Sequence, residues 1–550
     1  MCFSLSFSQL GLAALLATTL SVSAAEPAWT GYRGPEGTGV FPDSNPPTDC
    51  DLRAGRNVLW RAPLPNWAHG QPTIVKDRAF VLSEAGWKSD WPILSCIDLQ
   101  TGKVLWEREI NHLPATGLSP EKQQEVAKKW GEFHAEWRKL YTIFGETIGQ
   151  DKANVESAKT RLKEVGYILK GYSGGGYGQL RSLSPKPPCD IKGEAGLRPD
   201  VWRHGCGLAS DEIGCAFATP VTDGENIFVL VNRTAAASYD LEGKLRWMTF
   251  VGFSPERNGH VECTGGSAII SKGLMITTYF GHAYALDTVT GKVRWTQKTF
   301  TSGISTPVIA TIGGTQVLIA EGYQGKGGGV KAIRLPDGKP LTLTGWGPGG
   351  NAITLNTDQR DVVYFGNGVH AEFKTADSGI AQVWTKLAAG VRFSLEGDTL
   401  KPTVLWSGVG DSIVPLYHQG RVYLNGTVCD ALTGEVLAGG KGKPRVVPPT
   451  KHYLLIAKDR MYGLDGHSGL SDGPPPVGKP TATLHCYKLD GTKIAESPLF
   501  LEEPTAEKKT QIRSQVGWDR WNFGYGLPFN IAGDRIYIRS SDELICIGTK

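Results

Sequence analysis

Short runs of alternating apolar and polar residues, separated by turn sequences, recur along this chain. The clearest runs from Ala283 to Trp295 (AYALDTVTGKVRW), where an alternating segment leads to Asp287, a Thr-Gly turn and a second segment that ends at tryptophan. Alternation with a period of two is typical of a strand with one buried face, and Gly291 can adopt the positive φ that a tight turn needs. We therefore expect a β-hairpin here.

The same pattern appears at several other places. It recurs closely as CIDLQTGKVLW (96–106), and more loosely as YDLEGKLRW (239–247), CDALTGEVL (429–437) and YKLDGTKI (487–494). A unit this small cannot bury its own apolar face, so its copies must stack on one another. The recurrence predicts a propeller or a solenoid. The positions that define the repeat most clearly are Asp98, Gly102, Trp106, Asp240, Gly243, Trp247, Asp287, Gly291 and Trp295.

One strand pattern, NVLWRAPL at residues 57–64, has no hairpin partner before it. In a closed propeller, an N-terminal strand completes the last blade, whose other strands come from the C-terminus, and closure removes the open edges. Counting blades on this basis predicts an all-β fold, an eight-bladed β-propeller over residues 57–550. The fifth blade can end at Trp384 or at Trp406, and we favour Trp406 because it repeats the Val-Leu-Trp sequence.

Residues 107–215 are too many for a simple connection between blades, and we predict an insertion that contains an α-helical hairpin at about 119–170. Ser119-Pro120-Glu121 is typical of a helix start. We interpret the aromatic stripe of the first helix as a packing face. Apolar residues recur every three or four positions at Val126, Trp130, Phe133, Trp137, Leu140 and Phe144, then at Val155, Ala158, Leu162, Val165 and Leu169.

The N-terminal residues differ in character from the repeats. Residues 1–25 combine an apolar run with a small-residue end, as a secretory signal peptide does, although no Lys or Arg precedes the run. Residues 26–56 form a Gly- and Pro-rich lead, which we expect to lie extended along the body. No later stretch is long and apolar enough to span a bilayer. We therefore expect a monomer that is exported to the periplasm or secreted.

The charge balance of the chain narrows the possible partners. The 58 basic and 54 acidic residues give a net charge of only +4, and nucleic-acid binding normally requires a concentrated basic surface, so we expect no nucleic-acid partner.

Four of the ten cysteines fall in repeat strands, where buried free thiols are the simpler interpretation: Cys96, Cys429, Cys486 and Cys546. A disulfide among Cys189, Cys206 and Cys215, for example between Cys206 and Cys215, is plausible in an oxidising compartment, but spacing alone does not settle the pairing.

The A-x-D-x-x-T-G-K-x-x-W repeat resembles that of the pyrroloquinoline quinone (PQQ)-like, or quinoprotein-type, eight-bladed β-propellers. The lead WTGYRGPEGTGV is also similar to the openings of secreted bacterial members. The resemblance covers about residues 57–550 outside the insertion. It implies that the tryptophan of each outer strand docks against the glycine turn of a neighbouring blade. It says less about activity, because the family includes alcohol and sugar dehydrogenases as well as propellers that only bind proteins, such as the outer-membrane assembly factor.

The resemblance raises the question of a bound quinone. Quinoprotein alcohol dehydrogenases typically hold PQQ between a tryptophan and a disulfide of adjacent cysteines, beside a calcium ion. This sequence has no adjacent cysteines and no CxxCH haem motif. Some sugar-oxidising relatives lack that disulfide. We therefore expect no bound cofactor and no metal, with PQQ and calcium as the less favoured alternative.

Candidate chemistry lies in the loops that lead into the inner strands, because propeller ligands usually bind where these loops open on one end of the channel. His260 and Glu262 are the first catalytic candidates, since alternate residues of an extended segment point the same way; His69 and His452 follow. The three histidines His69, His260 and His452 could also form a metal site. The ligand-binding candidates from these loops are Glu212, Asp411, Arg520, Trp521, Asn522 and Tyr525.

Polar residues also collect in propeller channels for structural reasons, where they bind water and strand ends. We therefore favour a non-catalytic, secreted PQQ-like propeller that acts as a binding or scaffold module for a protein or glycan partner. The alternative is an enzyme at the channel mouth that acts on carbohydrate, or a quinoprotein-type alcohol or sugar dehydrogenase. The enzyme interpretation requires that the histidine and glutamate candidates converge in space.

Overall fold

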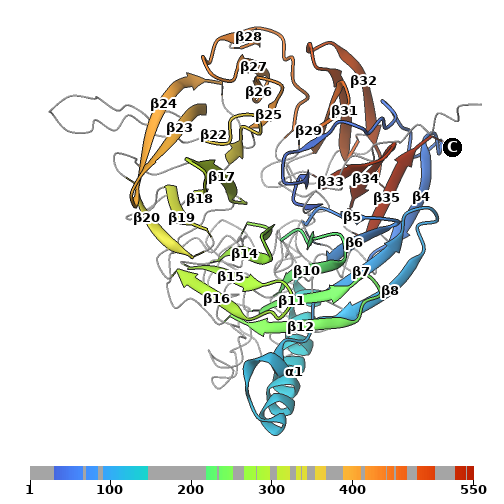
Figure 1. Cartoon of the computed structure of the whole chain (residues 1–550). Helices are drawn as coiled ribbons and strands as arrows, with labels where there is room; N and C mark the ends of the chain where they lie inside the picture. Colours follow the sequence, from blue (N-terminus) through green and yellow to red (C-terminus); the bar gives the residue numbers. More distant parts are fainter. Residues whose placement is uncertain are drawn as a thin grey trace, which may run out of the picture.

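The strands form a ring of antiparallel four-stranded meanders around a central axis, and the first strand of each meander is innermost (Figure 1). We call these meanders blades and number them in chain order. The computed structural model describes residues 30–65, 68, 70–83, 91–145, 218–231, 235–251, 266–279, 282–297, 306–321, 330–335, 337–343, 353–366, 388–410, 415–440, 442–450, 454–466, 480–501, 527–540 and 542–549.

Blades 1 to 4 take up the first part of the ring. Their strands, from the inside outward in each blade, are β5 (Thr73–Val75), β6 (Arg78–Ser83), β7 (Ile93–Asp98) and β8 (Val104–Glu109); β9 (Val221–Thr222), β10 (Asn226–Val231), β11 (Ala235–Asp240) and β12 (Leu245–Phe250); β13 (Ile269–Ser271), β14 (Leu274–Tyr279), β15 (His282–Asp287) and β16 (Val293–Gln297); and β17 (Val308–Ile312), β18 (Thr315–Glu321), β19 (Val330–Arg334) and β20 (Lys339–Leu343).

Blades 5 to 8 complete the ring. Their strands, in the same order, are β21 (Ile353–Leu355), β22 (Val362–Phe365), β23 (Ala388–Glu396) and β24 (Thr399–Val409); β25 (Leu416–His418), β26 (Arg421–Tyr423), β27 (Thr427–Asp430) and β28 (Val436–Gly439); β29 (Leu454–Ala457), β30 (Arg460–Gly466), β31 (Ala482–Lys488) and β32 (Lys493–Leu499); and β33 (Phe529–Ala532), β34 (Arg535–Arg539), β35 (Glu543–Gly548) and β4 (Val58–Pro63).

The ring closes as the sequence predicts. Strand β4 pairs antiparallel with β35, and Trp60 lies opposite Cys546. The isolated N-terminal strand thus completes a sheet whose other strands come from the C-terminus, which confirms the predicted closure and the β-propeller fold class. Trp406 lies in β24, the outer strand of blade 5, as we favoured. The total of eight blades stays a prediction for the whole chain, because several stretches lie outside the described residues.

Blades 4 and 5 depart from the regular pattern. Strand β20 pairs in parallel with the start of β24, through Thr342 with Thr399 and Leu343 with Leu400. The two blades therefore share one eight-stranded sheet among the described strands. Strand β24 is long enough to pair with both β20 and β23, because it runs over 11 residues.

The apolar cores lie between neighbouring blades. Strand β11 is buried at all six positions, while the outer strand β12 of the same blade begins with two exposed residues. A strand inside a blade is covered on both faces by adjacent blades, so it is buried along its length, whereas an outer strand is partly exposed. One cluster joins Phe228 of blade 2, Ile276 of blade 3 and Leu318 of blade 4.

The N-terminal lead enters the centre of the ring. It forms β1 (Thr30–Gly31), β2 (Gly34–Pro35) and β3 (Val40–Phe41). Strand β1 pairs with the inner strand of blade 2, and β3 pairs with the inner strand of blade 7. We call residues 30–41 the strap. The expectation that the lead simply lies along the body is therefore incomplete, because this part covers the inner edges of two blades.

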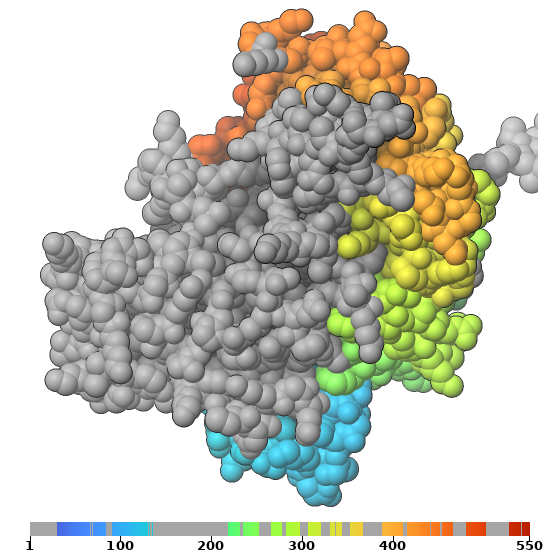
Figure 2. All heavy atoms as spheres, turned by 90° about the vertical axis from the view of Figure 1, so that its left-hand side faces the viewer, coloured from blue at the N-terminus to red at the C-terminus, as the bar shows by residue number. Residues whose placement is uncertain are grey.

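A helix follows blade 1 and extends away from the ring (Figures 1 and 2). It spans Pro120–Gly145 (α1), after a short 3₁₀ helix at Leu113–Thr116 (η1), and the amide of Lys122 donates to Ser119 Oγ at its start. Strand β8 continues to Glu109, so the insertion starts after it rather than at 107. The second predicted helix and the signal peptide lie outside the described residues. No described helix has the length and apolar character needed to cross a membrane.

Candidate functional site

The loops that lead into the inner strands carry the predicted catalytic and ligand-binding residues, and their convergence stays a prediction. All ten candidates lie outside the described residues: His69, Glu212, His260, Glu262, Asp411, His452, Arg520, Trp521, Asn522 and Tyr525. The described part of the channel belongs instead to the strap and to the inner strands with the turns that follow them.

The repeat tryptophans dock against glycine turns of the next blade. The ring of Trp60 covers Gly102 so closely that a Cβ atom there would lie 2.7 Å from it, and Trp60 Nε1 donates to the carbonyl oxygen of Leu99 at 2.9 Å. Each tryptophan thus joins two blades, as the family resemblance implies. The same close approach occurs between Trp106 and Gly243, Trp247 and Gly291, Trp295 and Gly338, and Trp406 and Gly434.

The repeat aspartates hold the same turns. Asp287 Oδ1 accepts hydrogen bonds from the amides of Val289 and Thr290 and from the Thr290 hydroxyl. These bonds, led by the one from the Thr290 amide, lower the pKa of the Asp287 carboxyl. Asp98 and Asp430 make equivalent bonds in blades 1 and 6. The conspicuous sequence motif therefore stabilises the ring, and a binding site must be sought elsewhere.

The strap is anchored in the channel by buried hydrogen bonds. Gln71, fully buried at the start of blade 1, accepts from the Arg33 amide at 2.6 Å and donates through Nε2 to the Phe529 carbonyl of blade 8 at 2.7 Å. The Gln71 amide donates to Thr219 Oγ1 next to blade 2. Arg33 Nη2 donates to the carbonyl of Pro415, next to blade 6, at 3.1 Å. The strap therefore ties together blades that are distant in the sequence.

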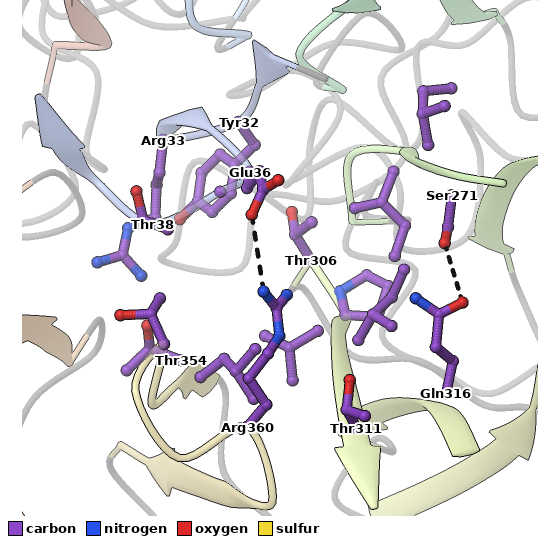
Figure 3. A pocket seen from close by; sticks show the side chains of 18 of the residues that line it. Tyr32, Arg33, Glu36, Thr38, Ser271, Thr306, Thr311, Gln316, Thr354 and Arg360 are labelled. Atoms are coloured by element: carbon purple, nitrogen blue, oxygen red, sulfur yellow. Dashed lines mark hydrogen bonds and ion pairs between the residues drawn. The ribbon is translucent and has the colours of Figure 1, made fainter. Parts of the chain in front are cut away.

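A cavity of about 520 Å³ remains between the strap and the inner strands of blades 3, 4 and 5 (Figure 3). Its walls combine branched apolar side chains, such as Ile270 and Val308, with the hydroxyl groups of several threonines. Ser271 of blade 3 and Gln316 of blade 4 form a side-chain hydrogen bond of 3.5 Å along one wall. This volume lies within the range of small-molecule sites.

The cavity has a charged mouth. Glu36, Lys272, Thr357 and Arg360 are exposed, and the carboxylate of Glu36 faces the Arg360 guanidinium at 3.9 Å (Figure 3). Lys272 and Arg360 lie in the turns that follow inner strands β13 and β21. The mouth therefore opens at the end of the channel opposite to the loops that carry the predicted candidates.

Arg33 is the charged group deepest in this region. Its side chain is only 2% exposed, and its Nε has no hydrogen-bond partner among the described residues. Burial lowers the pKa of Arg33, because the surrounding protein solvates the cation poorly. The backbone of Arg33 has a φ of 61°, which is uncommon for any residue other than glycine.

The sequence analysis did not identify this cavity. Arg33 belongs to no repeat, and the walls come from the strap and three blades that are far apart in the chain. A partial signal was available in the lead, where four glycines surround Tyr32, Arg33 and Glu36. Such a density of glycine permits close backbone packing and unusual φ values, but it does not indicate what the segment packs against.

The expectation that the chain holds no PQQ and no calcium stays a prediction, because the candidate loops lie outside the described residues. No group of three histidine, cysteine, aspartate or glutamate side chains that could hold a metal occurs among them. The described cysteines are free and buried, which confirms the expectation for the four repeat-strand thiols, and burial raises the pKa of Cys96 to about 12. Cys206 and Cys215 lie outside the described residues. We therefore derive no chemical step through the quinone.

Comparison with known proteins agrees with the repeat geometry. Residues 199–401 match a family model described as "Outer membrane protein assembly factor BamB". The matched stretch includes the described strands of blades 2, 3 and 4. The match confirms the family resemblance inferred from the Asp, Gly and Trp positions. No curated protein matches the chain.

Solved structures that match this chain have low sequence identity to it. BamB from Moraxella catarrhalis is 13% identical, over 59% of this chain and 80% of that one, with a TM-score of 0.35. The quinohemoprotein alcohol dehydrogenase from Comamonas testosteroni is 11% identical, over 91% of this chain and 78% of that one, with a TM-score of 0.41. The C-terminal WD40 domain of Sif2 is 12% identical, with 60% and 79% covered and a TM-score of 0.34. Likenesses this distant carry no conclusion about activity.

Proposed function

We propose that this chain is an exported propeller that acts as a binding or scaffold module for a protein or glycan partner. The observation that carries the proposal is the strap, which occupies the inner edges of blades 2 and 7 and is fixed by buried hydrogen bonds that Arg33 donates to Gln71 and to the Pro415 carbonyl. A ring that fills part of its own channel offers partners the loops and turns at its two ends. The description of the matching family model, an assembly factor, also supports this role.

The partner surface in this proposal is the end of the channel formed by the loops that lead into the inner strands. Arg520, Trp521, Asn522 and Tyr525 bring an arginine, two aromatic rings and an amide together in one short segment. Aromatic and arginine side chains dominate the binding energy of protein interfaces, and aromatic rings stack on sugars. The residues of this segment are therefore the first to vary.

A binding experiment tests the proposal. Purified protein would be immobilised and exposed to a panel of purified envelope glycans and outer-membrane proteins, with affinity read by biolayer interferometry. We expect saturable binding to one class, weakened about tenfold or more by Trp521→Ala, because removing an interface anchor typically costs 2 kcal/mol or more. Val289→Ala, in an 82% exposed turn position at the other end of the blades, is the matched control and should leave binding unchanged.

The same protein distinguishes the alternative function. Samples incubated with PQQ and calcium would be assayed for dye reduction with alcohols and sugars. Quinone-dependent turnover, together with no saturable binding to any macromolecule, would replace the proposed function with a dehydrogenase.

A further inference from the structure

The cavity beneath the strap has the features of a site for a small anion, and none of these features depends on the proposed partner surface. Its deepest charged group, Arg33, is a cation that is 2% exposed. Arg33 Nη2 donates to a neutral carbonyl, that of Pro415, and Nε has no partner among the described residues. No carboxylate of the described residues pairs with Arg33 either, and a buried charge without a counter-ion is unfavourable, so an anion that reaches this group gains more than it would at the surface.

The position of Arg33 relative to the cavity is suitable for ligand recognition. The side chains of Arg33 and Thr38 extend from the strap on the side of the cavity where Thr354 lies (Figure 3). Thr354 is 3% exposed and comes from the inner strand of blade 5. The guanidinium and these two hydroxyl groups therefore border the same part of the cavity.

The remaining walls are amphipathic. Thr306 lines the cavity between Arg33 and the wall of blade 4, and Gln316 presents its amide close to Ser271. Ile270 and Val308 supply apolar surface between these polar groups. A sugar ring has the same mixture, with hydroxyl groups around its edge and C–H groups on its faces. The walls are therefore complementary to a sugar rather than to a purely apolar acid.

The number of cations indicates the charge of the ligand. Phosphate sites usually combine several cations or a nest of backbone amides. Among the described lining residues Arg33 is the one buried cation; Arg360 already faces Glu36 at 3.9 Å, and Lys272 is exposed to solvent at the mouth. One free planar guanidinium matches one carboxylate, which it can bind through two parallel hydrogen bonds.

We propose that this cavity binds a carboxylated sugar, with the carboxylate paired to Arg33 and the ring hydroxyl groups facing Thr38, Thr306 and Thr354. The mouth between Glu36 and Arg360 is the entrance. The ligand enters at the end of the channel opposite to the proposed partner surface, so the two sites are independent.

Isothermal titration calorimetry on the full purified chain tests this inference with three probes of known chemistry: D-glucuronate, D-glucose and inorganic phosphate. We expect D-glucuronate to bind about tenfold or more tightly than D-glucose, since a hydrogen-bonded charge pair contributes at least that factor. Phosphate should bind more weakly than D-glucuronate, because the described lining offers one buried cation, Arg33, and the other cations, Lys272 and Arg360, are exposed at the mouth.

Two arginine variants then locate the charge. Arg33→Met keeps the length of the side chain and should abolish the preference for D-glucuronate over D-glucose. Its melting temperature is measured beside the affinity, because the variant removes a buried charge, which stabilises, and also the buried hydrogen bond to the Pro415 carbonyl, which destabilises. Arg294→Gln is the matched control, because Arg294 is an exposed arginine of the outer strand of blade 3 that does not line the cavity, and it should change D-glucuronate affinity less than about threefold, the range of exposed ion pairs.

The contrary results are equally specific. Equal affinity for D-glucose and D-glucuronate, tighter binding of phosphate, or no heat with any probe would each overturn the proposal. If Arg33→Met fails to fold, Thr354→Val tests the same site by removing one hydroxyl without changing the volume much. Unchanged D-glucuronate affinity in a folded Thr354→Val protein would overturn the inference, whereas a several-fold loss would support it.

Discussion

The outer belt of tryptophan and glycine contacts and the strap at the centre are built in opposite ways. In the belt, one contact is repeated between successive blades, as between Trp60 and Gly102 and between Trp247 and Gly291. At the strap, each contact differs from the others: Arg33 reaches a carbonyl 382 residues away, and Gln71 reaches one 458 residues away. Repetition therefore builds the ring, while the part that is not repeated gives the channel its particular chemistry.

This difference separates two kinds of stability. A belt contact joins two adjacent blades through a large buried ring, so its loss should weaken the whole propeller. The strap is attached mainly through hydrogen bonds to the inner edges, so its loss should open the channel and leave the blades paired. Stability and channel closure should therefore respond to different substitutions.

The largest expected effect is the loss of a belt tryptophan. Trp247 is 8% exposed, contacts the turn at Gly291 and donates through Nε1 to the Thr288 carbonyl at 2.8 Å. We expect Trp247→Ala to lower the free energy of unfolding by about 3–5 kcal/mol, the usual cost of removing a buried aromatic ring. Urea denaturation followed by circular dichroism measures the change.

A control on the same strand keeps this prediction specific. Leu245 is 46% exposed and lies two residues before Trp247 on the same strand. Leu245→Ala should change the free energy of unfolding by less than about 0.5 kcal/mol, as is usual at surface positions. Similar losses in both variants would contradict the belt interpretation.

The second effect concerns the glycine on the other side of the contact. Gly291 has a φ of 68°, and a Cβ atom there would lie 2.5 Å from the Trp247 ring. We expect Gly291→Ala to cost about 2–4 kcal/mol, because backbone strain and overpacking add. Gly273 in the same blade has a φ of 75° but only Thr288 Oγ1 nearby, at 3.9 Å. Gly273→Ala should therefore cost only the strain, about 1 kcal/mol. Equal costs would show that docking adds nothing to backbone strain.

The third prediction moves from the belt to the strap. Gln71→Leu leaves the Arg33 amide and the Phe529 carbonyl without their buried partner. An unsatisfied Arg33 amide costs about 1–3 kcal/mol, and detachment of the strap exposes this amide to water. We therefore expect trypsin to cleave at Arg33 much faster in Gln71→Leu than in the parent, with the ring still folded by circular dichroism.

The strap prediction has its own contrary outcome. If Gln71→Leu lowers the urea midpoint as much as Trp247→Ala while cleavage at Arg33 stays slow, the strap is part of the ring's stability. The distinction between belt and strap would then be wrong.

The belt could be predicted from the sequence because its signals are local. The Asp, Gly and Trp of each repeat lie within nine residues. The turn requires glycine because its φ is positive, and this requirement is visible at one position of the sequence. The orphan strand at Trp60 even predicted how the ring closes. Nothing comparable marks Arg33, whose surroundings come from blades 1, 6 and 8 only after the ring has formed. The predicted candidates such as His260 and Tyr525 remain predictions, since they lie outside the described residues.

The smallest predicted effect is a dependence of belt stability on pH. Hydrogen bonds within the turns lower the pKa values of Asp98, Asp287 and Asp430 below their ordinary range. A carboxyl whose pKa is depressed in the folded protein stabilises it above the unfolded pKa of about 4, and this stabilisation is lost as the pH falls through the folded pKa. We expect the urea midpoint of the parent to be flat near pH 7 and to fall below about pH 4.

Asp287→Asn shows whether one turn contributes to this slope. Asparagine retains an acceptor oxygen for the amides of Val289 and Thr290 but does not ionise, so the variant should lose a small part of the acid dependence. Val289→Ala, in the same turn and 82% exposed, should keep the slope of the parent. If Asp287→Asn is as sensitive to acid as Val289→Ala, the turn carboxylates do not set the acid stability of the belt. The acid sensitivity must then come from carboxylates outside the repeat turns, and the belt would hold through packing of its tryptophans alone.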